Sequence, residues 1–281
     1  MATIHQLGVV ITTYNSPEWL HWVLTGYACQ TDRNFRVIIA DDGSTDATRT
    51  LIEQHQSSGP LTIDHIWHED QGFRKCTILN KAIAETECDY LIFTDGDCIP
   101  RADFIATHRA MAEENTFLSG GYVKLTMPVS EAITEDDITT GRLFDRAWLV
   151  QQGQPNTHKL NKLTDKTWMR TLFNRITPTK ATWNGMNSST WRKHLVAVNG
   201  FNEDMQYGGL DRELGERLWN LEIHSKQIRY SAICLHLDHP RGYAKPEIWA
   251  RNNAIRAEVK QNNVQWTDNG IVKEKRDETS E

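Results

Sequence analysis

The chain has 281 residues, which is enough for one large α/β domain or two modest ones. Its shares of hydrophobic residues, 39%, and of charged residues, 24%, are ordinary for a soluble globular protein. The formal net charge of -6 argues against a general nucleic-acid-binding protein, because such proteins usually carry a basic excess or a basic stripe. The five cysteines are scattered without a CxxC pair, which indicates reduced thiols and no disulfide framework.

No targeting segment is expected at the start of the chain. Residues 1–15 lack the basic region and the long apolar run of a secretory signal peptide. Nowhere does an apolar stretch approach the ~20 residues of a membrane-spanning helix. We therefore expect a cytoplasmic protein, and peripheral contact with the inner face of a membrane stays open as an alternative.

Strand and helix patterns alternate four times at the start of the chain. Residues 7–15 form a β-branched apolar run that ends in polar residues, the pattern of a buried parallel strand. Ser16 and Pro17 then suit the N-cap and the first position of a helix. Further strands are expected at 35–46, 61–70 and 89–97, and helices at 44–56 and 74–86. This order predicts an α/β fold with a Rossmann-like, mostly parallel central sheet flanked by helices.

Polar side chains collect at the carboxyl ends of the expected strands, the edge at which ligands bind in such a sheet. They are Thr12, Thr13 and Tyr14 after the first strand, Asp41 and Asp42 after the second, and Asp95 and Asp97 after the fourth. This edge is therefore the expected site.

Asp95 and Asp97 are separated by one glycine at the tip of a buried strand. Two carboxylates so close together repel each other unless a cation neutralises them, and a divalent ion with oxygen ligands suits such a pair. A turn is the alternative, because Asp-Gly is a common turn dipeptide. The stretch around Asp42 is similarly open, since an acid-rich turn that opens a helix can hold a nucleotide base or ribose or serve only to cap the helix.

The pattern weakens after about residue 104, although a helix at 103–115 and a strand at 117–125 are still expected. Within residues 159–180, apolar residues at near-helical spacing are interleaved with lysine and arginine. This stretch has three interpretations: a helix that packs over the sheet with a solvated basic face, a lid on an acceptor site, or a helix at a membrane surface.

Four stretches of the first 125 residues, VVITTYNSPEWL, VIIADDGSTDAT, QGFRKCTILNKAIA and YLIFTDGDCIPRADFI, together resemble the inverting family 2 glycosyltransferases of the GT-A fold. Residues 183–218, which begin WNGMNSSTWRKH, are similar to the galactosyltransferase-like C-terminal half of such enzymes. The resemblance implies a donor-binding part at 1–125, a helical insertion at 126–182, an acceptor-binding and catalytic part at 183–265, and a flexible tail at 266–281.

The resemblance also implies roles for residues that match the family motifs. Thr12, Tyr14 and Asp42 would contact the uracil and ribose of a UDP-sugar. Arg74 would lie near the nucleotide, and Gly185 would belong to the donor-binding positions.

The acids Asp95 and Asp97 correspond to the DxD motif, which implies Mn²⁺ or Mg²⁺ bridged to the donor diphosphate. Asp211 falls where the family places the catalytic base. His236 would be a further metal ligand, with His239 as the second choice. From the residues alone, Asp211 would as readily serve as a helix cap, and a lone histidine is more often structural than a ligand.

Two departures from the family pattern concern the acceptor. The motif Glu-Asp is replaced by Leu210-Asp211, for which Glu213 is a candidate substitute, and the tryptophan of G-W-G is replaced by Tyr207 or Gly208. The expected activity is a metal-dependent, inverting transfer of a sugar from UDP to a saccharide or lipid-linked saccharide, in bacterial surface polysaccharide or lipopolysaccharide assembly. A sugar-phosphate nucleotidyltransferase is an alternative, although no glycine-rich loop follows the first strand; a non-catalytic sugar- or nucleotide-binding module is another.

Overall fold

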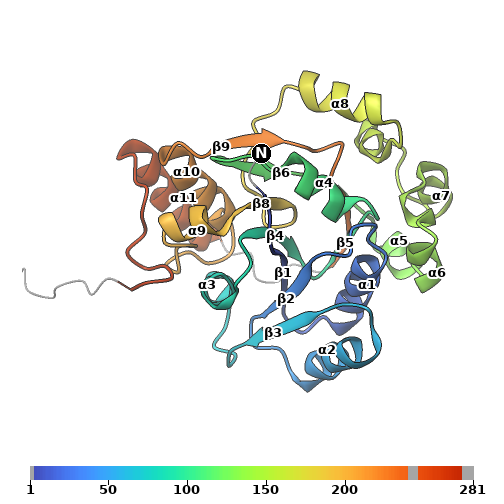
Figure 1. Ribbon diagram of the computed structural model, residues 1–281, viewed down its shortest axis with the longest axis horizontal. Helices are drawn as coiled ribbons and strands as arrows, with labels where there is room; N and C mark the ends of the chain where they lie inside the picture. The colour runs from blue at the N-terminus through green and yellow to red at the C-terminus, as the bar shows by residue number, and fades with distance from the viewer. Residues whose placement is uncertain (1–2, 240–245, 274–281) are drawn as a thin grey trace, which may run out of the picture.

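The computed structural model describes residues 3–239 and 246–273. A seven-stranded sheet runs through the centre of the molecule, with helices on both of its faces (Figure 1). Its strand order is β3-β2-β1-β4-β8-β6-β9. The strands are β1 Leu7–Thr13, β2 Arg36–Asp41, β3 Ile63–Trp67, β4 Tyr90–Asp95, β6 Thr116–Ser119, β8 Ser188–Trp191 and β9 His224–Gln227.

The strands β3, β2, β1 and β4 are parallel, which confirms the predicted α/β fold. Their register sets Thr12 of β1 beside Asp95 of β4, and Thr13 beside Asp41 of β2. The polar strand ends therefore meet at one edge, as the sequence pattern predicts. The sheet then continues through β8, which runs antiparallel to both β4 and β6 and which the sequence pattern did not indicate.

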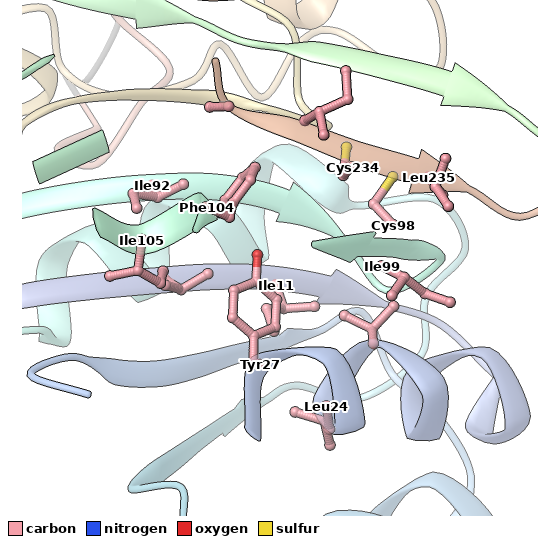
Figure 2. Packing of buried hydrophobic residues seen from close by; sticks show 14 of the residues in the cluster. Ile11, Leu24, Tyr27, Ile92, Cys98, Ile99, Phe104, Ile105, Cys234 and Leu235 are labelled. Atoms are coloured by element: carbon pink, nitrogen blue, oxygen red, sulfur yellow. The ribbon is translucent and has the colours of Figure 1, made fainter. Parts of the chain in front are cut away.

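Alternate side chains of the central strands enter two separate hydrophobic cores, because successive residues of a strand point to opposite faces. Val9 and Ile11 lie in the first core, beneath α1, α2 and α4, where Figure 2 shows Ile11 close to Tyr27. Val10 lies in the second core, beneath α3, α9 and α10. These helices are α1 Pro17–Ala28, α2 Asp46–Ser58, α3 Lys75–Glu85, α4 Phe104–Met111, α9 Arg192–Ala197 and α10 Leu210–Asn220.

A second, three-stranded sheet lies beyond the tip of β4 and consists of β5 Cys98–Pro100, β10 Ile233–His236 and β7 Gly121–Lys124, in that order. The prediction of a single strand at 117–125 is wrong. The strand is interrupted at Gly120, so that β6 belongs to the large sheet and β7 to the small sheet. A Cβ at Gly120 would overlap the side chain of Asn187. In the small sheet, His236 pairs with Cys98, which brings a distant part of the chain next to Asp97.

Residues 126–182 form short helices along the rim of the molecule (Figure 1). Leu160 and Leu163 of this stretch are buried, whereas α8, Thr167–Ile176, has no buried side chain. The first interpretation of this stretch, a helix packed over the sheet, is therefore wrong for α8, whose Trp168 is 65% exposed. The elements are α5 Met127–Glu131, α6 Glu135–Thr139, α7 Arg146–Gln151 and α8 Thr167–Ile176, with 3₁₀ turns η1 Arg142–Phe144 and η2 His158–Leu163.

The C-terminal part is not separate from the sheet, because β8 and β9 are strands within it. The last helix, α11 Pro246–Gln261, packs on α10. Residues 266–273, which were predicted to belong to a flexible tail, are held against the protein, since the side-chain amide of Asn199 donates hydrogen bonds to the carbonyls of Thr267 and Val272. Residues 274–281 of that tail lie outside the described residues. Within the described ranges, no helix has both the length and the apolar character needed to cross a bilayer.

Candidate active site

A cleft of about 1080 Å³ opens at the carboxyl ends of β1, β2 and β4. Its walls come from these strand tips, the start of α3, the small sheet and the loops before β8 and α10. Nine of the ten predicted site residues line it, and Arg74 does not: they are Thr12, Tyr14, Asp42, Asp95, Asp97, Gly185, Asp211, His236 and His239. Residues predicted from widely separated stretches thus share one cavity, at the edge that the strand order predicts.

Asp95 is held by a lysine at the start of α3. Its Oδ1 lies 2.6 Å from Nζ of Lys75 and accepts a 2.8 Å hydrogen bond from the hydroxyl of Thr12. Burial alone would lower the pKa of Lys75, but attraction to Asp95 and Asp211 raises it well above its usual value. Burial alone would raise the pKa of Asp95, yet Lys75 holds it below its usual range. At neutral pH the two groups therefore form an ion pair.

Asp97 faces two histidines. Its Oδ2 lies 3.6 Å from Nε2 of His236 and 3.2 Å from Nε2 of His239, and the two imidazole rings are stacked. The Nδ1–H of His236 donates to the carbonyl of Leu237, so in the neutral ring Nε2 keeps its lone pair for a ligand. Cys98 lies close by, but burial raises the pKa of its thiol well above the usual value and keeps it protonated.

Asp211 lies in the first turn of α10, directly after two glycines with left-handed backbone, Gly208 (φ 103°) and Gly209 (φ 89°). Its Oδ1 is buried and has no hydrogen-bond partner within the described part of the chain. Burial raises the pKa of Asp211 to about 6, although attraction to Lys75 opposes the shift. A carboxylate with such a pKa is mostly ionised at pH 7 and more basic than usual, which suits a general base.

Gly185 allows the backbone to approach Asp211. A Cβ at this position would lie 2.8 Å from Oδ1 of Asp211, so any larger residue would displace the carboxylate. The donor-binding role of Gly185 stays a prediction; what the structure shows is that Gly185 lies against the candidate base.

Glu213 does not take the place of the missing acceptor-binding acid. Its side chain is 1% exposed and forms a bidentate ion pair with Arg217, with Oε1···Nε at 2.7 Å and Oε2···Nη2 at 2.8 Å. Arg217 also donates to the carbonyls of Val198 and Gly200. The pair joins α10 to the loop after α9, and the substitute role suggested for Glu213 is therefore wrong.

Asp42 is fixed by two donors at the tip of β2. Its oxygens accept hydrogen bonds from Nε2 of His68 (2.7 Å) and from the backbone amide of Arg74 (3.0 Å). The guanidinium of Arg74 instead donates to the carbonyl of Glu69, so its side chain does not reach the cleft. Tyr14 is half-exposed on the cleft wall, and its hydroxyl donates to Asp70.

Among the cleft residues that sequence reasoning missed are Lys75 and Trp249. Lys75 directly follows Arg74 in the QGFRK stretch, so this stretch does supply a basic residue to the cleft, but the residue is Lys75 and not Arg74. Trp249 of α11 lines the cleft and packs against Gly208, where a Cβ would lie 2.7 Å from its ring. No local pattern indicates that α11 reaches the cleft, because this depends on how α11 packs on α10.

The geometry can be compared with known proteins. The sequence profile described as Glycosyl transferase family 2 matches residues 8–183. This chain belongs to glycosyltransferase family 2. The match includes the acids Asp95 and Asp97 and the strand tips that form the cleft. The family assignment confirms the resemblance seen in the sequence.

Relatives and structural neighbours of this family 2 glycosyltransferase agree with the fold. The uncharacterized glycosyltransferase YfnE of Bacillus subtilis (strain 168) is 28% identical over 271 residues, which cover 83% of this chain and 64% of YfnE. The chain thus spans less than two thirds of that relative. TarS 1–349 of S. aureus in complex with UDP-GlcNAc superposes with a TM-score of 0.60 at 15% identity, covering 92% of this chain and 69% of TarS 1–349.

A mannosyltransferase from Pyrobaculum calidifontis, in complex with GDP-Man and Mn²⁺, superposes with a TM-score of 0.55 at 16% identity. The superposition covers 92% of this chain and 70% of the mannosyltransferase chain. The neighbours have the GT-A fold, which confirms the predicted architecture.

Proposed function

We propose that this chain transfers a sugar from UDP to an acceptor hydroxyl, with a divalent cation and with inversion at the anomeric carbon. One observation carries the proposal: Asp97, His236 and His239 converge in the same cleft that contains the carboxylate of Asp211. The first group suits a cation, and Asp211 suits the acceptance of a proton. A cleft that supplies both can bind a diphosphate and activate a hydroxyl.

The residues present fit a divalent cation. Ligand atoms of Asp97, Cys98 and His236 lie within 4.8 Å of one another, and Nε2 of His239 lies 3.2 Å from Oδ2 of Asp97. Asp97 and His236 would hold the cation, with His239 beside them. Imidazole is a common ligand of transition metals, whereas Mg²⁺ strongly prefers oxygen, so the set favours Mn²⁺ over Mg²⁺. When bound, the cation would offset the negative charge that develops on the departing diphosphate.

The nucleoside would lie beside the tips of β1 and β2. Asp42 is held there by His68 and by the amide of Arg74, which presents its carboxylate in one orientation for a ribose hydroxyl or a base N–H. The exposed ring of Tyr14 offers a flat surface next to it. The complex of TarS with UDP-GlcNAc supports UDP as the nucleotide, while the mannosyltransferase complex with GDP-Man makes GDP the competitor to test.

Asp211 would act on the acceptor. As the acceptor oxygen attacks the anomeric carbon, its proton would pass to Asp211 while the bond from that carbon to the UDP oxygen breaks and its electron pair leaves with UDP. A single displacement from the face opposite UDP inverts the configuration. Its buried Oδ1 has no hydrogen-bond partner of good geometry within the described residues, although the backbone amide of Gly185 and Lys75 both favour the ionised carboxylate.

The acceptor would be a saccharide or a lipid-linked saccharide, as in bacterial surface polysaccharide assembly. The cleft supports this through Trp249, whose exposed ring can stack on a sugar face in the cleft that Asp211 also lines. The departure from the G-W-G motif lies at the same place, because Gly208 leaves the space that this ring fills.

Calorimetric titration with UDP, GDP and dTDP, each in Mn²⁺ and in EDTA, tests the donor half of the proposal. We expect UDP to bind tightly only with Mn²⁺. A UDP-sugar panel would then be assayed for release of UDP, with the anomeric configuration of the product determined by NMR. Metal-independent binding, preference for GDP or a retained configuration would each contradict the corresponding part of the proposal.

A further inference from the structure

Helix α8 turns an apolar face toward solvent. Trp168, Leu172 and Ile176 recur every fourth residue and are 65%, 42% and 57% exposed. On a helix of 3.6 residues per turn this spacing places them on one side, and Arg175 falls within the same arc. Exposed apolar residues in a contiguous patch on a helix mark an interaction surface more often than isolated ones do.

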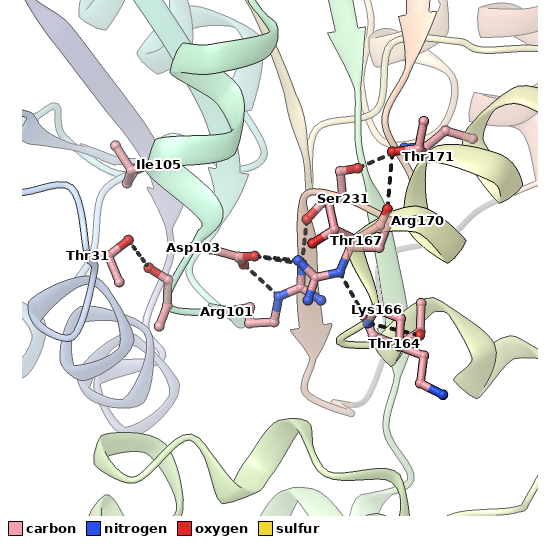
Figure 3. Close-up of polar contacts among 12 residues, drawn as sticks. Thr31, Arg101, Asp103, Ile105, Thr164, Lys166, Thr167, Arg170, Thr171 and Ser231 are labelled. Atoms are coloured by element: carbon pink, nitrogen blue, oxygen red, sulfur yellow. Dashed lines mark hydrogen bonds and ion pairs between the residues drawn. The ribbon is translucent and has the colours of Figure 1, made fainter.

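The opposite side of α8 is fixed to the protein by polar contacts, shown in part in Figure 3. Arg170 forms a 2.8 Å ion pair with Asp103, which also pairs with Arg101. One turn later, the side chain of Asn174 donates to Ser231 and accepts from the amide of Tyr230. The exposed side is therefore held outward by defined contacts on the inner side.

The surroundings of this apolar face are basic. Residues 159–180 contain six lysines and arginines and one aspartate, a net charge of +5 in a chain whose total is -6. Lys159, Lys166, Arg175 and Lys180 are exposed, whereas Arg170 is paired. The sequence on either side of this apolar face is thus basic, although the chain as a whole is acidic.

We infer that the exposed face of α8 docks on an anionic membrane surface. A tryptophan–leucine–isoleucine stripe flanked by lysine and arginine is the chemistry of a helix at a bilayer interface. Two copies of α8 facing each other in a symmetric dimer would oppose like charges. The stripe also offers only a few side chains, whereas a stable protein interface needs about 20 to 30 residues on each side.

The docked helix would set the cleft beside the bilayer. Lys159, Leu160 and Lys162, just before α8, line the cleft, and so do Thr182 and Trp183 just after it. No residue of α8 itself lines the cleft described by residues 3–239 and 246–273, so the face stays available while the cleft is occupied. Together with the proposed function, this placement suits an acceptor whose saccharide is carried by a membrane lipid.

Vesicle co-sedimentation tests the docking. The purified chain would be mixed with vesicles of phosphatidylcholine alone or of phosphatidylcholine with phosphatidylglycerol, at low salt and in about 1 M salt, where the Debye length is only about 3 Å. We expect binding to the anionic vesicles at low salt and its loss at high salt. The double variant W168S/L172S should bind about tenfold more weakly or worse, and Arg175→Glu about tenfold more weakly.

Trp219→Ser is the matched control, because Trp219 is 45% exposed on α10, away from this stretch. It should bind vesicles like the unchanged chain. Mn²⁺-dependent UDP titration of each variant tests the proposed function separately from vesicle binding, since no residue of α8 lines the cleft. No binding to anionic vesicles, or binding that W168S/L172S leaves unchanged, would overturn the inference. So would self-association in ultracentrifugation that the double variant abolishes, since that would assign the face to a second copy.

Discussion

The side-chain nitrogen of Lys75 lies 2.6 Å from Oδ1 of Asp95, so a cation of the protein itself neutralises the first acid of the Asp95–Gly96–Asp97 turn. Asp97, the second acid, faces His236 and His239. The two neighbouring carboxylates therefore have different partners, one built into the fold and one suited to an added cation.

Replacing Lys75 by methionine should destabilise the fold. Asp95 would keep a mostly buried charge without its partner, which we expect to cost about 2 to 4 kcal/mol of unfolding free energy at pH 8. Because Lys75 holds the pKa of Asp95 below its usual value, this stabilisation exists above the ordinary carboxyl pKa and fades as Asp95 becomes protonated in acid. Urea unfolding at pH 8 and below about pH 3 would measure both.

Lys81→Met is the control for that experiment. Lys81 is on the same helix, and its 3.9 Å pair with Glu85 is exposed, so its loss should cost less than about 1 kcal/mol. Equal losses for the two variants would show that the Lys75–Asp95 pair contributes nothing particular.

The rate of transfer should fall in mild acid. Burial raises the pKa of Asp211 to about 6, and the carboxylate must be ionised to accept a proton. In kcat/KM we expect a plateau above about pH 7 and a tenfold fall per pH unit well below 6. Measuring Mn²⁺-dependent UDP binding at each pH separates protonation of Asp211 from loss of the cation, because only loss of the cation should weaken UDP binding. An acid limb near the ordinary carboxyl pKa of about 4 would contradict the raised value.

Asp211→Asn should abolish transfer and keep metal-dependent UDP binding, because the amide has nearly the same shape but cannot take the proton. It should also stabilise the fold at pH 8. A raised carboxyl pKa means that stability is lost as pH rises from the ordinary value through about 6, at a cost of up to about 3 kcal/mol that asparagine avoids. Urea unfolding and a transfer assay measure the two effects, and near-normal transfer would exclude Asp211 as the base.

The sequence predicts the donor half of the cleft well, for a physical reason. β1, β2 and β4 are mostly apolar runs buried on both faces, and each ends in polar residues, so period and composition alone indicate parallel strands with a common polar edge. The strand pattern by itself therefore indicates that Asp42 and Asp95 lie at the same edge of the sheet.

The remaining features depend on contacts between distant segments. β8 enters the sheet antiparallel between β4 and β6, and β10 joins β5, pairings that no local period encodes. The sequence alone does not tell whether an acid such as Glu213 faces a cleft or, as the structure shows, pairs with Arg217. The amphipathic pattern of α8 likewise does not say which of its apolar residues pack on the protein. In the structure Trp168, Leu172 and Ile176 face solvent, whereas Phe173 packs on Tyr230.

Substitutions at His236 and His239 should reveal which histidine binds the cation. His236 is 4% exposed, is fixed on β10 and has its Nδ1–H engaged by the carbonyl of Leu237, so its Nε2 is already oriented toward Asp97. We expect His236→Ala to weaken Mn²⁺-dependent UDP binding about 100-fold, as Asp97→Ala should, and His239→Ala only about tenfold. Calorimetry in Mn²⁺ would measure this, with the exposed His224 of β9 replaced by alanine as the control. If His239→Ala abolished binding while His236→Ala did not, the assignment of the two histidines would have to be reversed.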